Sequence, residues 1–142
     1  MPTLFSRIIA GELPGRFLWS DPQAVAFLSI NPITPGHSLV VPRAEVDRWI
    51  DLPPDLAAHL MRVAHAVGKA VQSAFDTPRV GLVIAGFEVH HTHLHVIGTH
   101  SMRDLDFARA DRNPAPAALD AAAAKIREAL RAAGHAQASD KP

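Results

Sequence analysis

Two stretches of the chain repeat apolar side chains at helical spacing. In residues 54–75 they recur every three or four positions, with charged side chains on the other faces. Residues 117–132 are rich in alanine and carry a sparser apolar line. The two stripes are Leu56, Leu60, Val63, Val67 and Val71 in the first, and Leu119, Ile126 and Leu130 in the second. We predict a helix over each, and a third, short helix over residues 4–10 that ends at Gly11.

The other apolar runs have the length and composition of β-strands. They cover residues 16–20, 25–29, 38–42, 80–85 and 92–99. Short turns rich in proline and glycine separate the first three, so we predict an antiparallel meander, and we expect the last two strands to pair. A chain of 142 residues fits one domain. We expect this domain to span residues 1–142, with its core over about 4–133 and a flexible tail over 134–142.

Charge and composition argue against several classes of partner. Lysine plus arginine equals aspartate plus glutamate, 14 against 14, so no basic surface for nucleic acid or a membrane is expected. The chain has no cysteine, which excludes disulfides and thiolate metal sites. We find neither a secretory signal nor an apolar run of about 18 residues. The sequence therefore predicts a cytoplasmic protein that binds neither nucleic acid nor a membrane.

Three histidines follow one another at two-residue spacing in the last strand-like run. On a β-strand, His91, His93 and His95 would share one face, while Leu94 and Val96 would enter the core on the other. Histidine can attack an electrophile, move a proton or orient a neighbour near neutral pH. The pattern therefore predicts a wall of imidazoles that serves a reaction.

The histidine run alone leaves three interpretations open. It could be an exposed polar edge. It could hold zinc through two histidines with help from His37 or Glu88. Only two could share the ion easily, because side chains four positions apart on a strand start about 13 Å apart. In the interpretation we favour, His93 attacks a phosphoryl centre while a hydrogen bond fixes its other ring nitrogen. His95 would then donate to a phosphoryl oxygen, and His91 would orient or screen the reacting group.

The histidine run and two upstream segments resemble the histidine triad (HIT) family. Residues 91–97 have its defining motif, His-x-His-x-His followed by two apolar residues, and residues 5–14 and 26–43 resemble its two amino-terminal signature stretches. The resemblance covers roughly residues 5–110. It implies an α+β fold, with an antiparallel sheet of about five strands and two helices, usually paired into a homodimer whose sheets join. It also implies catalysis without a cofactor or an essential metal.

The resemblance implies a role for each histidine. His93 would attack the α-phosphate of a nucleotide derivative, and water would cleave the nucleotidyl-histidine to release a nucleoside monophosphate. His91 and His95 would contact or organise the phosphate. His37 would orient the others from behind, although a hydrogen-bonded histidine that ends a turn is an alternative. The implied nucleotide-binding residues are Phe5, Ile8, Leu28, Ser29, Ile30 and Glu88. For the apolar members of this set, packing in the core is an equally good interpretation.

Two positions depart from the family pattern. Ser29 stands where many relatives carry an aspartate that holds the ribose hydroxyls, and Glu88 stands where a serine or threonine often meets the phosphate. The segment before the histidines, residues 85–91, is also shorter than in the phosphoramidase and dinucleoside-polyphosphate branches. We expect a nucleotide phosphoramidase or related hydrolase whose substrate is a purine nucleotide or nucleotidyl conjugate. The alternatives are a dinucleoside polyphosphate hydrolase and a nucleotide- or metal-binding module with little catalysis.

Overall fold

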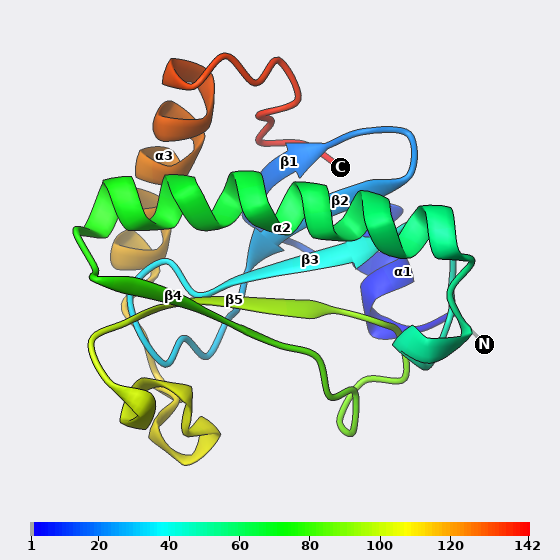
Figure 1. Ribbon diagram of the computed structural model, residues 1–142, viewed down its shortest axis with the longest axis horizontal. Coiled ribbons are helices and arrows are strands. Elements are labelled where there is room, and N and C mark those ends of the chain that lie inside the picture. Colours follow the sequence, from blue (N-terminus) through cyan, green and yellow to red (C-terminus); the bar gives the residue numbers. More distant parts are fainter. Residues whose placement is uncertain (1) are drawn as a thin grey trace.

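A five-stranded antiparallel sheet organises the part of the chain that the computed structural model describes, residues 2–142 (Figure 1). The helices are α1 (Leu4–Ile9), α2 (Pro54–Phe75) and α3 (Pro116–Ala132), and the strands are β1 (Phe17–Ser20), β2 (Ala24–Leu28), β3 (Ser38–Pro42), β4 (Arg79–Val83) and β5 (Leu94–Thr99). Short 3-10 turns cover Trp49–Asp51, Met102–Leu105 and Phe107–Arg109. The predicted α+β class, with five strands and two main helices, is confirmed.

The strand register places a histidine at the end of an apolar row. The strands follow the order β1-β2-β3-β5-β4, and each pair is antiparallel. His95 lies opposite Leu39, Leu39 opposite Phe27, and Phe27 opposite Phe17. Directly paired residues of neighbouring strands point to the same face of a sheet. The row therefore crosses four strands on one face and ends at the imidazole of His95.

Two layers of side chains cover the two faces of the sheet. Helices α2 and α3 pack on one face (Figure 1), where Leu94 and Val96 are buried in the main core, as the two-residue periodicity predicts. Ile126 and Leu130 of α3 are fully buried in the same core, and each such side chain contributes about 1.5–3 kcal/mol. On the other face Phe5 of α1 packs on the apolar row. The short α1 leaves part of that face uncovered.

A tight turn before β3 brings His37 to the sheet. Gly36 has φ +83°, and a Cβ there would lie 2.4 Å from Cε2 of Phe75, so only glycine fits. The turn closes through the His37 N–H, which donates to the Thr34 carbonyl at 3.1 Å. The Thr34 hydroxyl donates to the Gly98 carbonyl of β5 at 2.8 Å. These bonds fix His37 beside the strand that carries His95.

Residues 137–139, within the tail that we predicted to be flexible over residues 134–142, lie along strand β1. The Ser20 N–H donates to the Gln137 carbonyl at 3.0 Å, and the Ser139 N–H donates to the Leu18 carbonyl at 3.0 Å. Trp19 and Ala138 form an antiparallel bridge. Edge strand β1 offers unpaired backbone groups, and these residues satisfy them.

No helix in residues 2–142 is long and apolar enough to cross a membrane.

Candidate active site

A cavity of about 780 Å³ opens on the sheet face that α1 covers only in part. A volume of this size is typical of small-molecule sites. Its wall includes His93, His95 and all six positions that the resemblance implied for nucleotide binding: Phe5, Ile8, Leu28, Ser29, Ile30 and Glu88. Phe5 and Leu28 also belong to the buried clusters of the core, so these two side chains both pack in the core and line the cavity. Contact with a ligand remains a prediction for each of the six.

Of the three motif histidines, His93 and His95 line this cavity and His91 does not. The Phe5 ring nevertheless lies against the rings of both His91 and His93. Strand β5 begins at Leu94, after His91 and His93. Just before the strand, the N–H and the hydroxyl of Thr92 both donate to the Val46 carbonyl at 2.8 Å, so Thr92 bonds to the loop after β3. His91 is 0% exposed and is absent from the cavity wall. It lies behind the cavity wall, where it can orient other groups.

The ring of His91 is fixed by partners on both nitrogens. Its Nε2 lies 2.8 Å from the Pro42 carbonyl, which can only accept, so Nε2 carries the proton. Its Nδ1 then accepts from the Thr3 hydroxyl at 2.7 Å. The same hydroxyl accepts the Ser6 N–H and caps α1, the helix that carries Phe5. His91 therefore links β3 to the helix that forms one wall of the cavity.

His93 presents an unprotonated ring nitrogen to the cavity. Its Nδ1 lies 2.7 Å from the carbonyl of His91 and must donate to it, which leaves the lone pair of a neutral imidazole on Nε2. The ring of Phe5 packs edge-on against the His93 ring, with centroids 4.9 Å apart. Burial lowers the pKa of His93, so the ring is neutral near pH 7. This is the arrangement that a nucleophilic imidazole requires.

His95 presents a hydrogen-bond donor beside that lone pair. The Ile33 N–H donates to His37 Nδ1 at 3.1 Å, so His37 carries its proton on Nε2. That proton is donated to His95 Nδ1 at 2.9 Å, which leaves the His95 proton on Nε2. Burial lowers the pKa of His37 to about 4. Burial, followed by the influence of His93 and His37, lowers the pKa of His95 to about 3. Both rings are therefore neutral near pH 7.

His37 thus satisfies both interpretations of its role. It is hydrogen-bonded within the turn of residues 32–37, as a structural histidine would be, and it sets the tautomer of His95. Because both of its nitrogens are engaged, it has no lone pair left for a metal. Within residues 2–142 no three His, Asp or Glu side chains are grouped so that they could hold a metal ion. The rings of His93 and His95, 4.9 Å apart, offer a nucleophile and a donor side by side.

Several residues of the cavity wall had no signal in the sequence. Arg16, just before β1, pairs with Asp120 of α3 at 2.7 Å, and both line the cavity. Phe107 also lines it, from a turn after β5. Arg16 and Asp120 are 104 positions apart, so no local spacing relates them. The hydroxyl of Ser29 accepts the Asn31 N–H at 3.2 Å, so one of its lone pairs is used within the loop.

Comparison with known proteins identifies the family. Residues 10–102, more than half of the chain, match the model of the HIT domain. The chain belongs to the HIT domain family. This confirms the family predicted from the histidine motif and places the protein among nucleotide-binding hydrolases. It is 35% identical over 98 residues to an uncharacterized HIT-like protein of Methanocaldococcus jannaschii, a match that covers 66% of this chain and 76% of that one.

Two further relatives of this HIT protein are a solved structure and a named enzyme. A zinc-bound histidine triad family protein from Mycobacterium smegmatis superposes with a TM-score of 0.79 at 25% identity, covering 92% of this chain and 94% of that one. An adenylylsulfatase of Arabidopsis thaliana is 29% identical over 99 residues, a match that covers 66% of this chain and 50% of that protein. The first relative extends the likeness over nearly the whole fold.

Proposed function

We propose that this HIT protein hydrolyses nucleotidyl conjugates, nucleoside phosphoramidates foremost, at the α-phosphate through a covalent nucleotidyl-histidine. The observation that carries the proposal is the fixed pair of tautomers at the cavity. A free lone pair on His93 Nε2 lies beside an N–H donor on His95 Nε2. A phosphoryl centre needs both groups, one to attack phosphorus and one to stabilise the charge that gathers on its oxygens.

The proposed reaction proceeds in two successive displacements at the α-phosphorus. His93 Nε2 attacks the α-phosphorus, an N–P bond forms, and the bond from phosphorus to the leaving group breaks. The leaving group departs with its bonding electrons and takes a proton from solvent. Water then attacks the same phosphorus, the N–P bond breaks, and a nucleoside monophosphate leaves a neutral His93. In both steps the His95 Nε2–H donates to a phosphoryl oxygen, while His37 holds the opposite nitrogen of that ring.

The rest of the cavity suits a nucleoside. Phe27 and Leu39 form an apolar floor that runs from His95 towards β1. Arg16 and Asp120 lie at the β1 end, about three strand spacings or roughly 14 Å from β5. We expect a purine base and ribose to lie over the floor. With Ser29 in place of an aspartate, the polar contacts at this end fall to that hydroxyl and to the Arg16–Asp120 pair.

Glu88 favours a conjugate with a neutral or cationic leaving group over a dinucleoside polyphosphate. It lines the cavity beside His93, where burial lowers the pKa of the imidazole and the charge of Glu88 opposes that lowering in small part. A long polyphosphate chain would be repelled there, whereas an amine would not. The similarity to an adenylylsulfatase supports the size of the partner group but not its charge, because sulfate is small and anionic.

A nucleotidyl adduct on His93 is the expected intermediate. We expect mass spectrometry after rapid acid-free quenching with adenosine phosphoramidate to find one adenylyl group, located on the peptide that contains His93. Turnover should persist in excess chelator. Adducts located on another residue would overturn the mechanism. Tight monophosphate binding with no turnover of any phosphoramidate, adenylyl sulfate or dinucleoside polyphosphate would instead favour a binding module.

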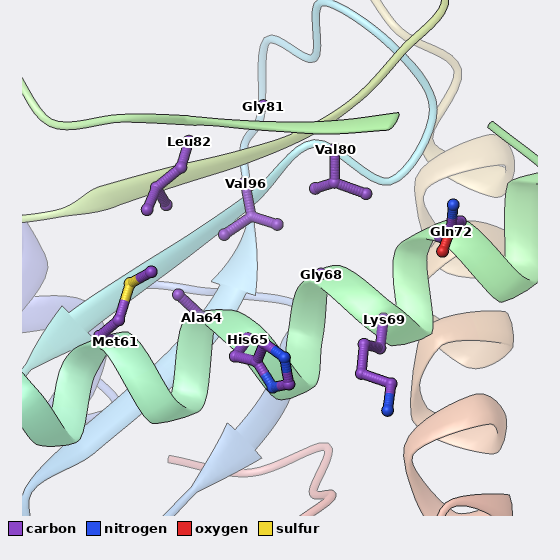
Figure 2. A pocket seen from close by; sticks show the side chains of 10 residues that line it. All are labelled: Met61, Ala64, His65, Gly68, Lys69, Gln72, Val80, Gly81, Leu82 and Val96. Carbon is purple, nitrogen blue, oxygen red and sulfur yellow. The ribbon is translucent and has the colours of Figure 1, made fainter. Parts of the chain in front are cut away.

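We also propose that two copies pair through β4 into a joined sheet. The other edge of the sheet, β1, is bridged by Ala138, whereas β4 has no partner on its outer side within residues 2–142. A hollow of about 270 Å³ lies between β4 and α2. Figure 2 displays Leu82 and Met61 converging at its rim; they are 41% and 53% exposed. An unpaired edge beside exposed apolar side chains suits a symmetric antiparallel contact between copies.

Replacing Leu82 by lysine should convert the dimer to a monomer. Each copy would then bring a charge into the apolar contact beside the strand edge that must pair. Size-exclusion chromatography with light scattering at tens of micromolar protein would measure this. Ile50→Lys, at an exposed apolar position on the turn Trp49–Asp51, is the matched control and should leave the dimer intact. A monomeric wild type, or a dimeric Leu82→Lys protein, would contradict the proposed interface.

A further inference from the structure

The segment after β5, residues 100–111, lies over the active site on the side where His37 meets His95; we call it the cap. The centroid of the Phe107 ring is 4.7 Å from that of His95, with the planes at 76°. It is 6.2 Å from that of His37, at 70°. The Phe107 ring is thus T-shaped to both imidazoles of the His37–His95 pair, and it is 38% exposed. Phe107 is the side chain of the cap that lines the cavity.

The cap is attached to the sheet on both sides of Phe107. Leu105 packs so closely on Gly81 of β4 that a Cβ at residue 81 would lie 2.5 Å from Leu105 Cδ2. The Asp111 N–H donates to the Pro32 carbonyl at 2.9 Å, in the turn that leads to His37. Attachment at these two points fixes where the Phe107 ring lies.

We propose that Phe107 is a positioning residue, whose ring excludes water from the His37–His95 hydrogen bond and so holds His95 as a neutral Nε2–H donor. The catalytic consequence rests on the proposed hydrolase function, whereas the effect on the two imidazoles does not. Phe107 acts through His95 and need not touch the phosphoryl group. No residue spacing in the sequence suggested this role.

Burial is the main determinant of the His95 pKa, because few charged or titratable groups face its ring. His93, from the segment before β5, and His37, from the turn before β3, are the titratable groups that act on it, and β4 places the uncharged Val83 opposite. The three acidic side chains of the cap are used locally. Asp104 accepts the His100 N–H, Asp106 accepts the Ala108 N–H, and Asp111 accepts the Asn113 N–H. The cap therefore acts on His95 through the apolar ring of Phe107, by keeping water out.

Removing the ring should let His95 take up a proton at higher pH. Water beside His95 would reduce the desolvation that now holds its pKa at about 3, so the pKa would rise towards 6.5. A protonated His95 carries N–H groups on both nitrogens. Its Nδ1–H would then face the Nε2–H of His37, two donors across 2.9 Å, and the hydrogen bond between the rings would be lost.

The test compares Phe107→Ala with Phe107→Leu in ligand-free protein by NMR of the histidine rings. We expect the titration midpoint of His95 to rise by about one pH unit or more in Phe107→Ala, and to stay near the wild-type value in Phe107→Leu, which keeps an apolar cover. The acid limb of kcat/KM should move in the same direction. Should Phe107→Ala not fold, Phe107→Ser also opens space over His95 and has the same expected result.

The two measurements separate this inference from the proposed function. Unchanged His95 titration and an unchanged pH profile in a folded Phe107→Ala protein would overturn the role of Phe107 while leaving the hydrolase intact. A wild-type protein that turns over no conjugate would overturn the hydrolase, and the NMR comparison would still decide the role of Phe107. Equal shifts in Phe107→Ala and Phe107→Leu would show that the cap acts by general packing, which also contradicts the inference.

Discussion

Replacing His93 by alanine should lower kcat/KM for an adenosine phosphoramidate by roughly 10³-fold or more. The substitution removes the nitrogen that attacks phosphorus, and no other ring nitrogen is placed to substitute for it. His95 Nδ1 is occupied by His37, and its Nε2 is protonated at neutral pH. Steady-state release of the monophosphate, measured at pH 7–8, would give the ratio. The adenylyl adduct should disappear in the same protein.

The matched control for this prediction is His90→Ala. His90 lies three positions earlier in the chain and is exposed. Its replacement tests whether the loss of a histidine elsewhere in the same segment also lowers turnover. We expect kcat/KM to stay within about two-fold of wild type, as for surface substitutions away from a site. His93→Ala should still bind the monophosphate, because the floor and walls of the cavity are unchanged. Near wild-type turnover in His93→Ala would contradict the nucleophile assigned here.

The helices and strands could be predicted from the sequence because their burial patterns are periodic. The apolar stripe of residues 54–75 becomes the buried face of α2, and the two-residue alternation after residue 93 sends Leu94 and Val96 into the core. The alternation did not predict that His91 is closed off from the cavity. Its position depends on Thr92, which donates twice to the Val46 carbonyl, 46 residues away. A contact of that kind ends a strand without changing the local pattern of polar and apolar residues.

Some residues of the active site could be predicted from the sequence, and others could not. The resemblance placed His37 behind the motif and six positions on the cavity wall, and the structure gathers them there. Phe107, Arg16 and Asp120 could not be predicted, because their positions follow from how the cap and α3 pack on the sheet. The same holds for residues 137–139, which complete the edge of β1. Such contacts join segments far apart in sequence, and no short-range pattern encodes them.

His91→Ala should destabilise the fold more than it impairs the chemistry. The substitution empties a fully buried site and leaves the Pro42 carbonyl and the Thr3 hydroxyl without their partner. Together these losses should lower the free energy of unfolding by about 2–4 kcal/mol. The carbonyl of residue 91, which holds His93 Nδ1, belongs to the backbone and is retained by alanine. We therefore expect kcat to fall only about 10–10²-fold, through looser placement of His93.

Urea denaturation and steady-state turnover on the same protein would separate this role from direct contact with the phosphate. Thr3→Val is the companion variant, because it removes the hydroxyl that donates to His91 Nδ1 and caps α1, at a cost of about 1–2 kcal/mol. If His91 instead touched the phosphate, His91→Ala would lose activity as severely as His93→Ala and unfold at the wild-type urea concentration. In that case the ring would have to leave its two present partners and turn into the cavity when substrate binds.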